Sequence, residues 1–205
     1  LGPHALPDML ASFCPSCEED VRHSRWVNRH HSGIGSIQVL LKQAEAVMWC
    51  YDRDVMGVNC AAMDAFKLHN PGLARAAASC SFLSAMLTVN WSNTAHCEAG
   101  RSAEVSLSIL ILFGDPAIFL FPEYGVRLLL QHGDVMWFNN ERAHCCEVIE
   151  CSRGRSYLLT GYIKNKTLQQ ANLPNEVTMR IAQAAARIPR GRPCIASSLG
   201  MVIWP

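Results

Sequence analysis

The sequence has no excess charge of either sign. Its 205 residues contain 18 Lys and Arg against 17 Asp and Glu, which gives a formal net charge of +1. A chain with so little net charge has no overall field to attract nucleic acid, so any basic binding surface has to be local. Residues 21–31, with arginines around Trp26, and residues 186–193 are the two candidates. The ordinary interpretation of both segments is solvated charge that binds nothing.

Long apolar runs are also missing. The longest apolar stretches, residues 105–113 and 117–121, are separated by Gly-Asp-Pro and fall short of the roughly 20 residues that a membrane helix needs. We therefore expect a soluble protein with no membrane partner. No basic start followed by an apolar run opens the chain, so its 10 cysteines are expected to be mostly reduced, intracellular thiols. The first residue is Leu1 rather than methionine, which suggests a processed chain or an excised domain.

What is present suffices for one substantial core, since half of the residues are hydrophobic. Residues 1–35 are rich in proline and glycine and lack periodicity, which predicts an irregular arm. From Ser36, apolar residues recur at three- and four-residue steps and predict a helix that ends near Asp52. A second helix is predicted after Pro71, where alanine dominates.

Strand patterns fill the second half of the chain. Between residues 82 and 166, at least six short apolar or alternating runs are separated by Gly, Asn, Asp and Pro. Helices followed by strands indicate an α+β fold, with helices packed on an antiparallel sheet or barrel. A last helix is predicted from near Pro174, with an irregular tail from Pro189. The expected division is an arm (1–35), a main domain (36–167, with helices in 36–80 and a β core in 82–165) and a C-terminal helix and tail (168–205).

A candidate metal site begins with His96 and Glu98. In an extended segment, residues i and i+2 point to the same face, so both side chains can reach one ion. Non-haem iron of the facial type uses two histidines and one carboxylate and leaves positions open for dioxygen and a co-substrate. The second histidine has to come from a distant strand, and His144 fits because it follows the predicted strand at 133–140. We therefore predict iron(II) held by His96, Glu98 and His144.

A candidate co-substrate residue follows. Arg155 opens a predicted strand eleven residues after His144. Its planar guanidinium can bind the far carboxylate of 2-oxoglutarate through two parallel hydrogen bonds. Arg153, two residues earlier, is the alternative. The order H-x-E, then His, then Arg, each at a strand edge, is more demanding than any one of these elements.

These motifs carry a resemblance over rather less than half of the chain. Residues 70–164 resemble the double-stranded β-helix of Fe(II)/2-oxoglutarate dioxygenases, in particular the TET/JBP family of nucleic-acid 5-methylpyrimidine oxygenases. The resemblance implies a jelly-roll, cupin-like core with N-terminal supporting helices and a C-terminal helix. Glu98 stands where the family has aspartate, and "DPAIFLF" replaces the family's paired glycines. The matching stretches are "SAMLTVN" (84–90), "HCE" (96–98), "FPEYGVRL" (121–128), "GDVMWFNN" (133–140), His144 and "RSYLL" (155–159).

The function implied by the resemblance is oxidation of the 5-methyl group of 5-methylcytosine or thymine in DNA or RNA, with DNA the preferred partner. Such a base would have to be flipped or single-stranded to reach the metal. A nuclear location is expected if the substrate is chromosomal DNA. The candidate base contacts are the polar residues near the expected mouth of the barrel, which could equally cap strand ends: Asn90, Asn93, Asn139, Asn140 and Arg142.

Four alternatives stay open at this point. The same iron chemistry could act on a protein side chain or a small molecule. Because Glu98 departs from the family pattern, a catalytically impaired module that only binds nucleic acid is another. A zinc nucleobase deaminase shares the H-x-E but needs a downstream P-C-x-x-C, which the sequence lacks. Cys14 and Cys17 form a lone C-x-x-C, which is either a separate zinc site or a pair of free thiols.

Overall fold

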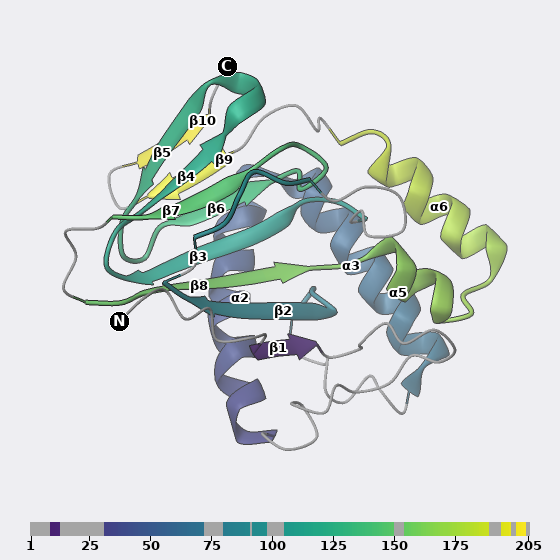
Figure 1. Ribbon diagram of the computed structural model, residues 1–205. Coiled ribbons are helices and arrows are strands. Elements are labelled where there is room, and N and C mark those ends of the chain that lie inside the picture. Colours follow the sequence, from purple (N-terminus) through teal and green to yellow (C-terminus); the bar gives the residue numbers. More distant parts are fainter. Residues whose placement is uncertain are drawn as a thin grey trace.

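The computed structural model describes residues 31–71, 80–90, 92–97, 105–149 and 154–188, and the backbone of 9–12, 194–197 and 200–203. Two long helices precede the main run of strands, and two shorter helices follow it (Figure 1). The elements are, in chain order, β1 (Met9–Ser12), α2 (His31–Tyr51), α3 (Arg53–His69), β2 (Ser84–Val89), β3 (Ser108–Gly114), β4 (Ala117–Phe121), η2 (Pro122–Tyr124), β5 (Val126–Leu130), β6 (Val135–Phe138), β7 (Cys145–Val148), β8 (Ser156–Tyr162), α5 (Asn165–Gln170), α6 (Asn175–Ala185), β9 (Cys194–Ser197) and β10 (Gly200–Ile203).

The first predicted helix is confirmed as α2, with a different start. It begins at His31 rather than at Ser36. A glycine inside a helix costs only about 1 kcal/mol, so the two glycines before Ser36 do not stop it. The structure also has a helix that the sequence analysis does not predict, α3, which ends at His69. The second predicted helix, after Pro71, stays a prediction. Most of the segment predicted to be helical, residues 72–79, lies outside the described residues.

Asp52 explains why α3 begins directly after α2. Its carboxylate accepts a hydrogen bond from the backbone N–H of Val55, with N and Oδ1 3.2 Å apart. This is an N-cap, which satisfies one of the unpaired donors of the first turn of α3. The residue that marks the end of α2 therefore also starts α3.

The described strands form two antiparallel sheets. The larger has the order β1-β2-β8-β3-β6-β9-β10, and the smaller has the order β5-β4-β7. After β3 the chain moves to the smaller sheet for β4 and β5, returns for β6, and crosses twice more for β7 and β8. Two facing sheets connected in this way are a double-stranded β-helix, or jelly roll. The predicted α+β fold class with this core is confirmed.

The ends of the chain correct the sequence-based prediction. β1 lies in the segment predicted to be an irregular arm, and β9 and β10 lie in the tail predicted to be irregular. β1 pairs with β2, and β9 pairs with β6. These pairings join segments that are far apart in the sequence, so no local pattern announces them. The predicted domain boundaries stay a prediction.

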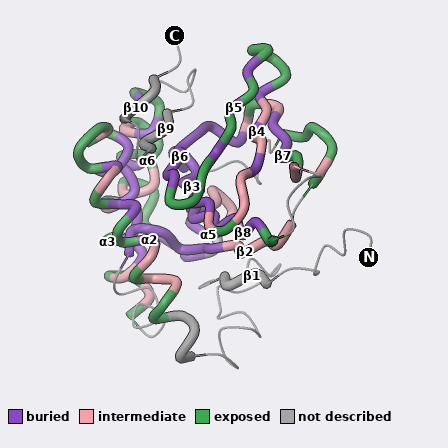
Figure 2. The backbone as a smooth tube through the Cα atoms, turned by 90° about the vertical axis from the view of Figure 1, so that its left-hand side faces the viewer, coloured by how far each residue is buried: buried purple, intermediate pink, exposed green. Residues whose placement is uncertain are grey.

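Alternation along the strands separates two faces of the larger sheet. Leu112 and Leu158 are paired residues of β3 and β8, and both face the smaller sheet, where they join a buried cluster with Phe119 and Phe138. The residues of opposite parity face the helices. Figure 2 shows this layering, with α2 and α3 on one side of the larger sheet and β4, β5 and β7 on the other.

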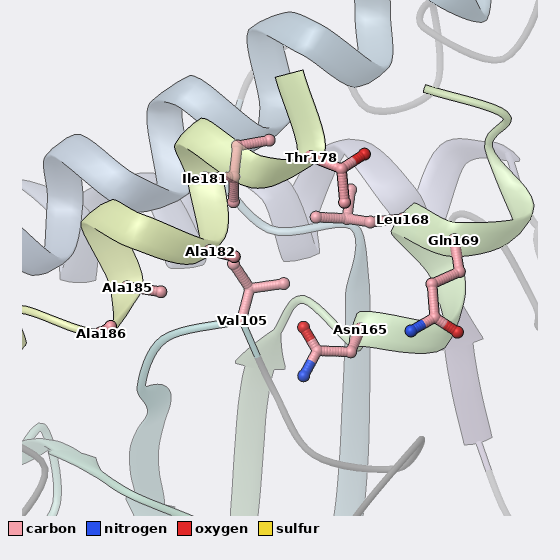
Figure 3. Close-up of a pocket in the computed structure, with 9 residues that line it drawn as sticks. All are labelled: Val105, Asn165, Leu168, Gln169, Thr178, Ile181, Ala182, Ala185 and Ala186. Carbon is pink, nitrogen blue, oxygen red and sulfur yellow. The ribbon is translucent and has the colours of Figure 1, made fainter. Parts of the chain in front are cut away.

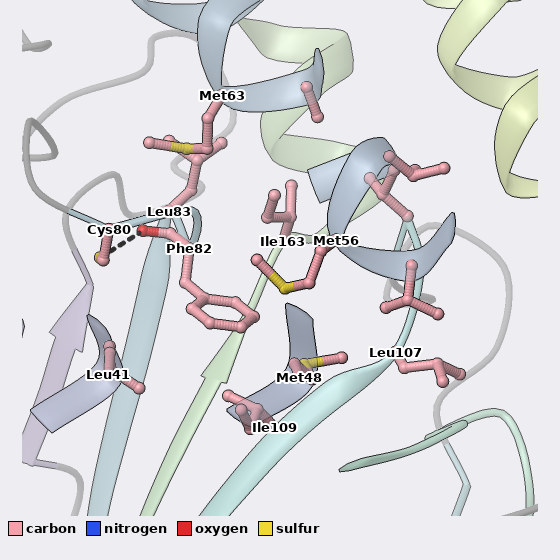
Figure 4. Close-up of a cluster of buried hydrophobic side chains, with 14 of the residues drawn as sticks. Leu41, Met48, Met56, Met63, Cys80, Phe82, Leu83, Leu107, Ile109 and Ile163 are labelled. Atoms are coloured by element: carbon pink, nitrogen blue, oxygen red, sulfur yellow. Dashed lines mark hydrogen bonds between the residues drawn. The ribbon is translucent and has the colours of Figure 1, made fainter. Parts of the chain in front are cut away.

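The helix-facing side holds the larger core. Leu41 and Met48 of α2 and Met56 of α3 are fully buried against Phe82 and Ile109 (Figure 4). Full burial of one such side chain stabilises the fold by about 1.5–3 kcal/mol. This core holds the larger sheet rigid, which leaves its other face and the smaller sheet to build a site. None of the described helices is long and apolar enough to cross a membrane.

Candidate metal centre

His144 lies directly before β7, at one end of the space between the two sheets. It has the same parity as Cys146, which faces the buried cluster between the sheets, and its residue is only 5% exposed. Its ring stacks on Phe119, with centroids 5.8 Å apart and planes 9° apart, and meets the edge of Phe138 at 5.0 Å. The aromatic side chains therefore fix the ring at the end of the barrel interior, which we call the mouth.

The hydrogen bond of His144 decides which ring nitrogen carries the lone pair. Its Nδ1 lies 2.8 Å from the carbonyl oxygen of Arg142. A carbonyl can only accept, so Nδ1 carries the hydrogen, and the neutral ring keeps its lone pair on Nε2. A metal-binding histidine commonly has this arrangement, with a carbonyl or carboxylate holding the other nitrogen. His144 therefore fits the requirements of a ligand.

His96 lies directly opposite His144. The two residues form an isolated antiparallel bridge, with N···O distances of 3.0 Å from His96 and 2.9 Å from His144. Directly opposed residues point to the same face, and the ring centroids are 4.6 Å apart. His96 is exposed, so one side of this histidine pair opens to solvent. The structure thus brings together two of the three predicted ligands, 48 positions apart in the printed sequence.

Asn93 holds the segment of His96 onto β7. Its backbone N–H donates to the carbonyl oxygen of Cys146 (3.2 Å), and the N–H of Cys146 donates to Asn93 Oδ1 (2.9 Å). Its Nδ2 lies 2.7 Å from Nδ1 of His96. Both ends of this side-chain amide are therefore used within the protein. The sequence suggests Asn93 as a base contact and gives no sign of this clamp.

The turn of the "PEYG" motif supports the approach to His144. Glu123, in η2, accepts a long hydrogen bond from the N–H of Ala143 (3.4 Å) and lies 3.7 Å from the guanidinium of Arg142. Both side chains of the ion pair are about half exposed, so the pair itself adds little stability. Its effect is to hold Arg142, a predicted base contact, against the "PEYG" turn. Arg142 is part of the loop that leads into His144.

The other predicted base contacts lie at strand ends. Asn90 has a φ of +49° and accepts from the N–H of Ser156 through Oδ1 (2.9 Å), so it caps the end of β2. Asn139 accepts from the N–H of Glu141 (3.1 Å) and, like Asn140, is buried. Asn90 and Asn139 thus make the hydrogen bonds expected of residues that cap strand ends. The substrate role of all of these residues stays a prediction.

Two thiols next to His144 are disfavoured as thiolates. Burial raises the pKa of the Cys146 thiol to about 12, with smaller contributions from Cys145 and Glu147. Burial first, and then Glu147, also raises the pKa of Cys145. A thiol binds metal as the thiolate, and burial disfavours this form of both groups. The predicted ligands in the described part of the site are the two histidines.

Several of the remaining predicted site residues lie in parts of the chain that the structure does not describe. Glu98, the predicted carboxylate ligand, lies outside the described residues, as do Arg153, Cys14, Cys17 and the basic residues 21–30. Among the residues that are described, no three His, Cys, Asp or Glu side chains come close enough to hold an ion together. A ligand set of three therefore needs a group from outside this part of the chain.

Arg155 is described and exposed. Its carbonyl accepts from the N–H of Asp115 (3.0 Å), just before β8 begins. Alternation puts Ser156, which is 2% exposed, on the same face as Leu158 and therefore toward the barrel interior. Ser156 rather than Arg155 is thus the inward residue at this end of β8.

A groove elsewhere on the molecule has a different character. It lies between α5 and α6 beside Val105, with a volume of about 430 Å³ (Figure 3). Leucine, isoleucine, valine, alanine and three uncharged polar side chains line it, without a titratable group. The groove has no side chain suited to acid–base or metal chemistry, and neither histidine of the pair lines it.

Comparison with known proteins supports the fold. No family model matches the chain, and no curated protein matches it. Among solved structures, NgTET1 in complex with 5mC DNA is similar with a TM-score of 0.54 and 15% sequence identity, covering 80% of this chain and 64% of that chain. The likeness is one of fold. The chain thus spans a little under two thirds of NgTET1, and a shared activity does not follow from 15% identity.

Two further solved structures are similar over short stretches. Protein NMB1881 from Neisseria meningitidis has a TM-score of 0.31 at 12% identity, covering 38% of this chain and 72% of that chain. Hydroxypropylphosphonic acid epoxidase from S. wedmorenis has a TM-score of 0.29 at 12% identity, covering 38% of this chain and 42% of that chain. Scores this low carry no argument about this protein.

Proposed function

We propose that this protein is a non-haem iron(II) oxygenase whose metal is held by His96, His144 and Glu98. The observation that carries the proposal is the histidine pair: two imidazoles bridged across the mouth of a jelly roll, with the lone pair of the neutral His144 ring on Nε2. Two histidines and a carboxylate form the ligand set of the facial iron site, and iron(II) bound there supplies the activation of dioxygen.

The residues around the pair have separate tasks in this proposal. The carbonyl of Arg142 orients His144, and Phe119 and Phe138 prevent its ring from turning. The same aromatic side chains close the inner side of the site to water, which keeps a reactive centre apart from the bulk solvent. The exposed side, at His96, is left for the substrate.

A metal titration tests the proposed ligands. Metal-free protein, titrated with iron(II) without oxygen, or with cobalt(II) as a coloured substitute, is expected to bind one ion per chain. His96→Ala is the main variant because His96 is exposed, so its loss should leave the fold intact while it weakens binding by at least about tenfold. His69→Ala, an exposed histidine in the last turn of α3, is the matched control. Equal binding by His96→Ala and His69→Ala would show that the ligand assignment is wrong.

We further propose 2-oxoglutarate as co-substrate and a 5-methylpyrimidine in DNA as substrate. The order of H-x-E, His and Arg supports the first, and the "PEYG" and "GDVMWF" motifs with the fold likeness to NgTET1 support the second. Succinate formation from 2-oxoglutarate tests the co-substrate, and Arg155→Ala should raise the concentration required far more than Arg153→Ala. An equal or larger effect of Arg153→Ala would move the role to that residue.

The substrate needs its own experiment. Oligonucleotides with 5-methylcytosine or thymine, incubated with iron and 2-oxoglutarate and digested to nucleosides, should gain one oxygen atom. Succinate without an oxidised nucleoside would direct the search to protein side chains or small molecules. Nucleic-acid binding without metal binding would indicate a module that has lost its chemistry. The antiparallel jelly roll lacks the strand and helix alternation expected of a zinc nucleobase deaminase, which we do not propose.

A further inference from the structure

We propose that Asn93 is a positioning residue that limits metal binding by deciding which ring nitrogen of His96 carries the hydrogen. The inference rests on the proposed metal site and adds to it a residue that acts through His96. It starts from the Asn93 clamp described above, in which one amide faces both a backbone N–H and an imidazole nitrogen.

The orientation of the Asn93 amide follows from its partner on β7. The backbone N–H of Cys146 can only donate, so the amide atom 2.9 Å from it has to be the oxygen. The –NH2 group of Asn93 is then the atom 2.7 Å from Nδ1 of His96. An amide nitrogen can only donate, so Nδ1 has to accept. In the neutral ring this puts the hydrogen on Nε2, the nitrogen that faces away from Asn93.

Metal binding makes the opposite demand on the ring. A nitrogen that carries hydrogen has no lone pair for a metal, so ligation through Nε2 requires the hydrogen to move to Nδ1. The carbonyl oxygen of Thr94, 3.1 Å from Nδ1, can accept that hydrogen. The –NH2 group of Asn93 cannot. Nδ1 of His96 therefore has two neighbours that favour different tautomers.

The two histidines of the pair consequently differ. The carbonyl of Arg142 favours the metal-binding tautomer of His144, whereas the shorter contact of His96, with Asn93, favours the other tautomer. Binding of a metal to His96 has to displace the –NH2 group, which lowers the affinity of the site. An acceptor at position 93 would remove this penalty and orient the ring for the metal, as carboxylates behind metal-binding histidines do.

Asn93→Asp tests this directly. Aspartate keeps an oxygen for the N–H of Cys146, at the same size, and replaces the donor beside His96 with an acceptor. We expect cobalt(II) to bind the metal-free variant about tenfold more tightly than the wild type. Asn90→Asp is the matched control, because it adds the same charge at a strand end and keeps an oxygen for Ser156, without a contact to His96. It should change the affinity by less than about threefold, since exposed charges are screened.

A spectroscopic measurement separates the tautomer from the charge. Long-range ¹H–¹⁵N correlation on metal-free protein, at a pH where imidazole is neutral, should show His96 with its hydrogen on Nε2 in the wild type and on Nδ1 in Asn93→Asp. Hydrogen on Nδ1 in the wild type, or an equal gain in affinity from both asparagine variants, would overturn the proposal. The tautomer is read without metal, so a failure of the iron assignment, seen in the His96→Ala titration, is distinguishable from a failure of this inference.

Discussion

At the scale of single residues, the neighbours of an imidazole decide its chemistry as much as its position does. His144 has a carbonyl behind Nδ1 and aromatic rings beside it, which fixes the ring and leaves the lone pair on Nε2. His96 has an amide donor 2.7 Å from the same atom. Identical side chains thus differ in their readiness to bind metal because hydrogen-bond donors and acceptors cannot exchange roles.

Glu45 is the clearest pH-sensitive residue away from the metal site. It lies on α2, is 6% exposed, and accepts a hydrogen bond from the backbone N–H of Ser81. Burial raises the pKa of this carboxyl above the usual 4.5, and the hydrogen bonds to Ser81 only partly offset the shift. As the pH rises through 4.5, the unfolded chain therefore loses this proton before the folded protein does, and the free energy of unfolding falls until the pH passes the raised pKa.

Glu45→Gln should remove this pH dependence. Glutamine keeps an oxygen for Ser81 but cannot ionise. The melting temperature of the variant, relative to the wild type, is expected to rise as the pH increases from 4.5 and to become constant once Glu45 is fully ionised. Thermal denaturation between pH 4 and pH 8 measures it, with the exposed Glu176→Gln as control. A difference that is the same at every pH would contradict the assignment.

The sequence predicts His96 and His144 as ligands but not Asn93. An H-x-E pair and a later histidine are patterns of residue type, which can be recognised directly in the sequence. The role of Asn93 depends on the backbone N–H of Cys146, 53 residues away, and any residue type there offers the same N–H. Arg155 shows a related limit of sequence-based prediction. Its residue type suits a carboxylate partner, but the register of β8 determines whether a residue at this end of the strand faces the barrel interior.

At the scale of elements, the turn between β3 and β4 requires a glycine. Gly114 has a φ of +84°, and a Cβ there would lie 2.0 Å from the carbonyl oxygen of Arg155. Gly114→Ala should therefore lower the free energy of unfolding by more than about 1 kcal/mol. Gly57→Ala, on the exposed side of α3 with no atom within 4 Å of the added Cβ, should raise it by up to about 1 kcal/mol. Urea denaturation of both variants measures the difference, and a Gly114→Ala variant as stable as the wild type would contradict it.

The elements also show where local patterns suffice. Every strand from β2 to β8 coincides with an apolar run that the sequence marks with Gly, Asn, Asp or Pro at its ends. β1, β9 and β10 are only four residues long each, and their order comes from pairing with strands already in the sheet. α3 as a whole is missed for a third reason, since Asp52 serves the end of one helix and the cap of the next.

At the scale of the whole molecule, the layers place the histidine pair at an edge. The helices cover one face of the larger sheet, and the smaller sheet covers the other, so the barrel interior is filled by buried apolar side chains. In the proposed function, the reaction takes place where the chain leaves this packed interior, at the mouth. One base of a DNA substrate would reach the proposed metal there, and the rest of the DNA would lie on the outer surface.

Nucleic-acid binding should therefore depend on local basic segments, because the net charge of +1 supplies no general attraction. Each phosphate contacted by an arginine releases counterions, so the affinity for a methylated oligonucleotide should fall linearly with the logarithm of the salt concentration, with a slope of about −0.9 per contact on duplex DNA. Arg25→Ala, in the segment around Trp26, is expected to reduce the slope by about 1. Arg127→Ala is the control, since Arg127 is already paired with Glu147 at 3.4 Å on the outer face of β5.

Fluorescence anisotropy at several salt concentrations gives the slopes. If the wild type bound with no salt dependence, or if both variants had the same slope, phosphate contact by this segment would be ruled out, while the metal site would still be tested by its own titration.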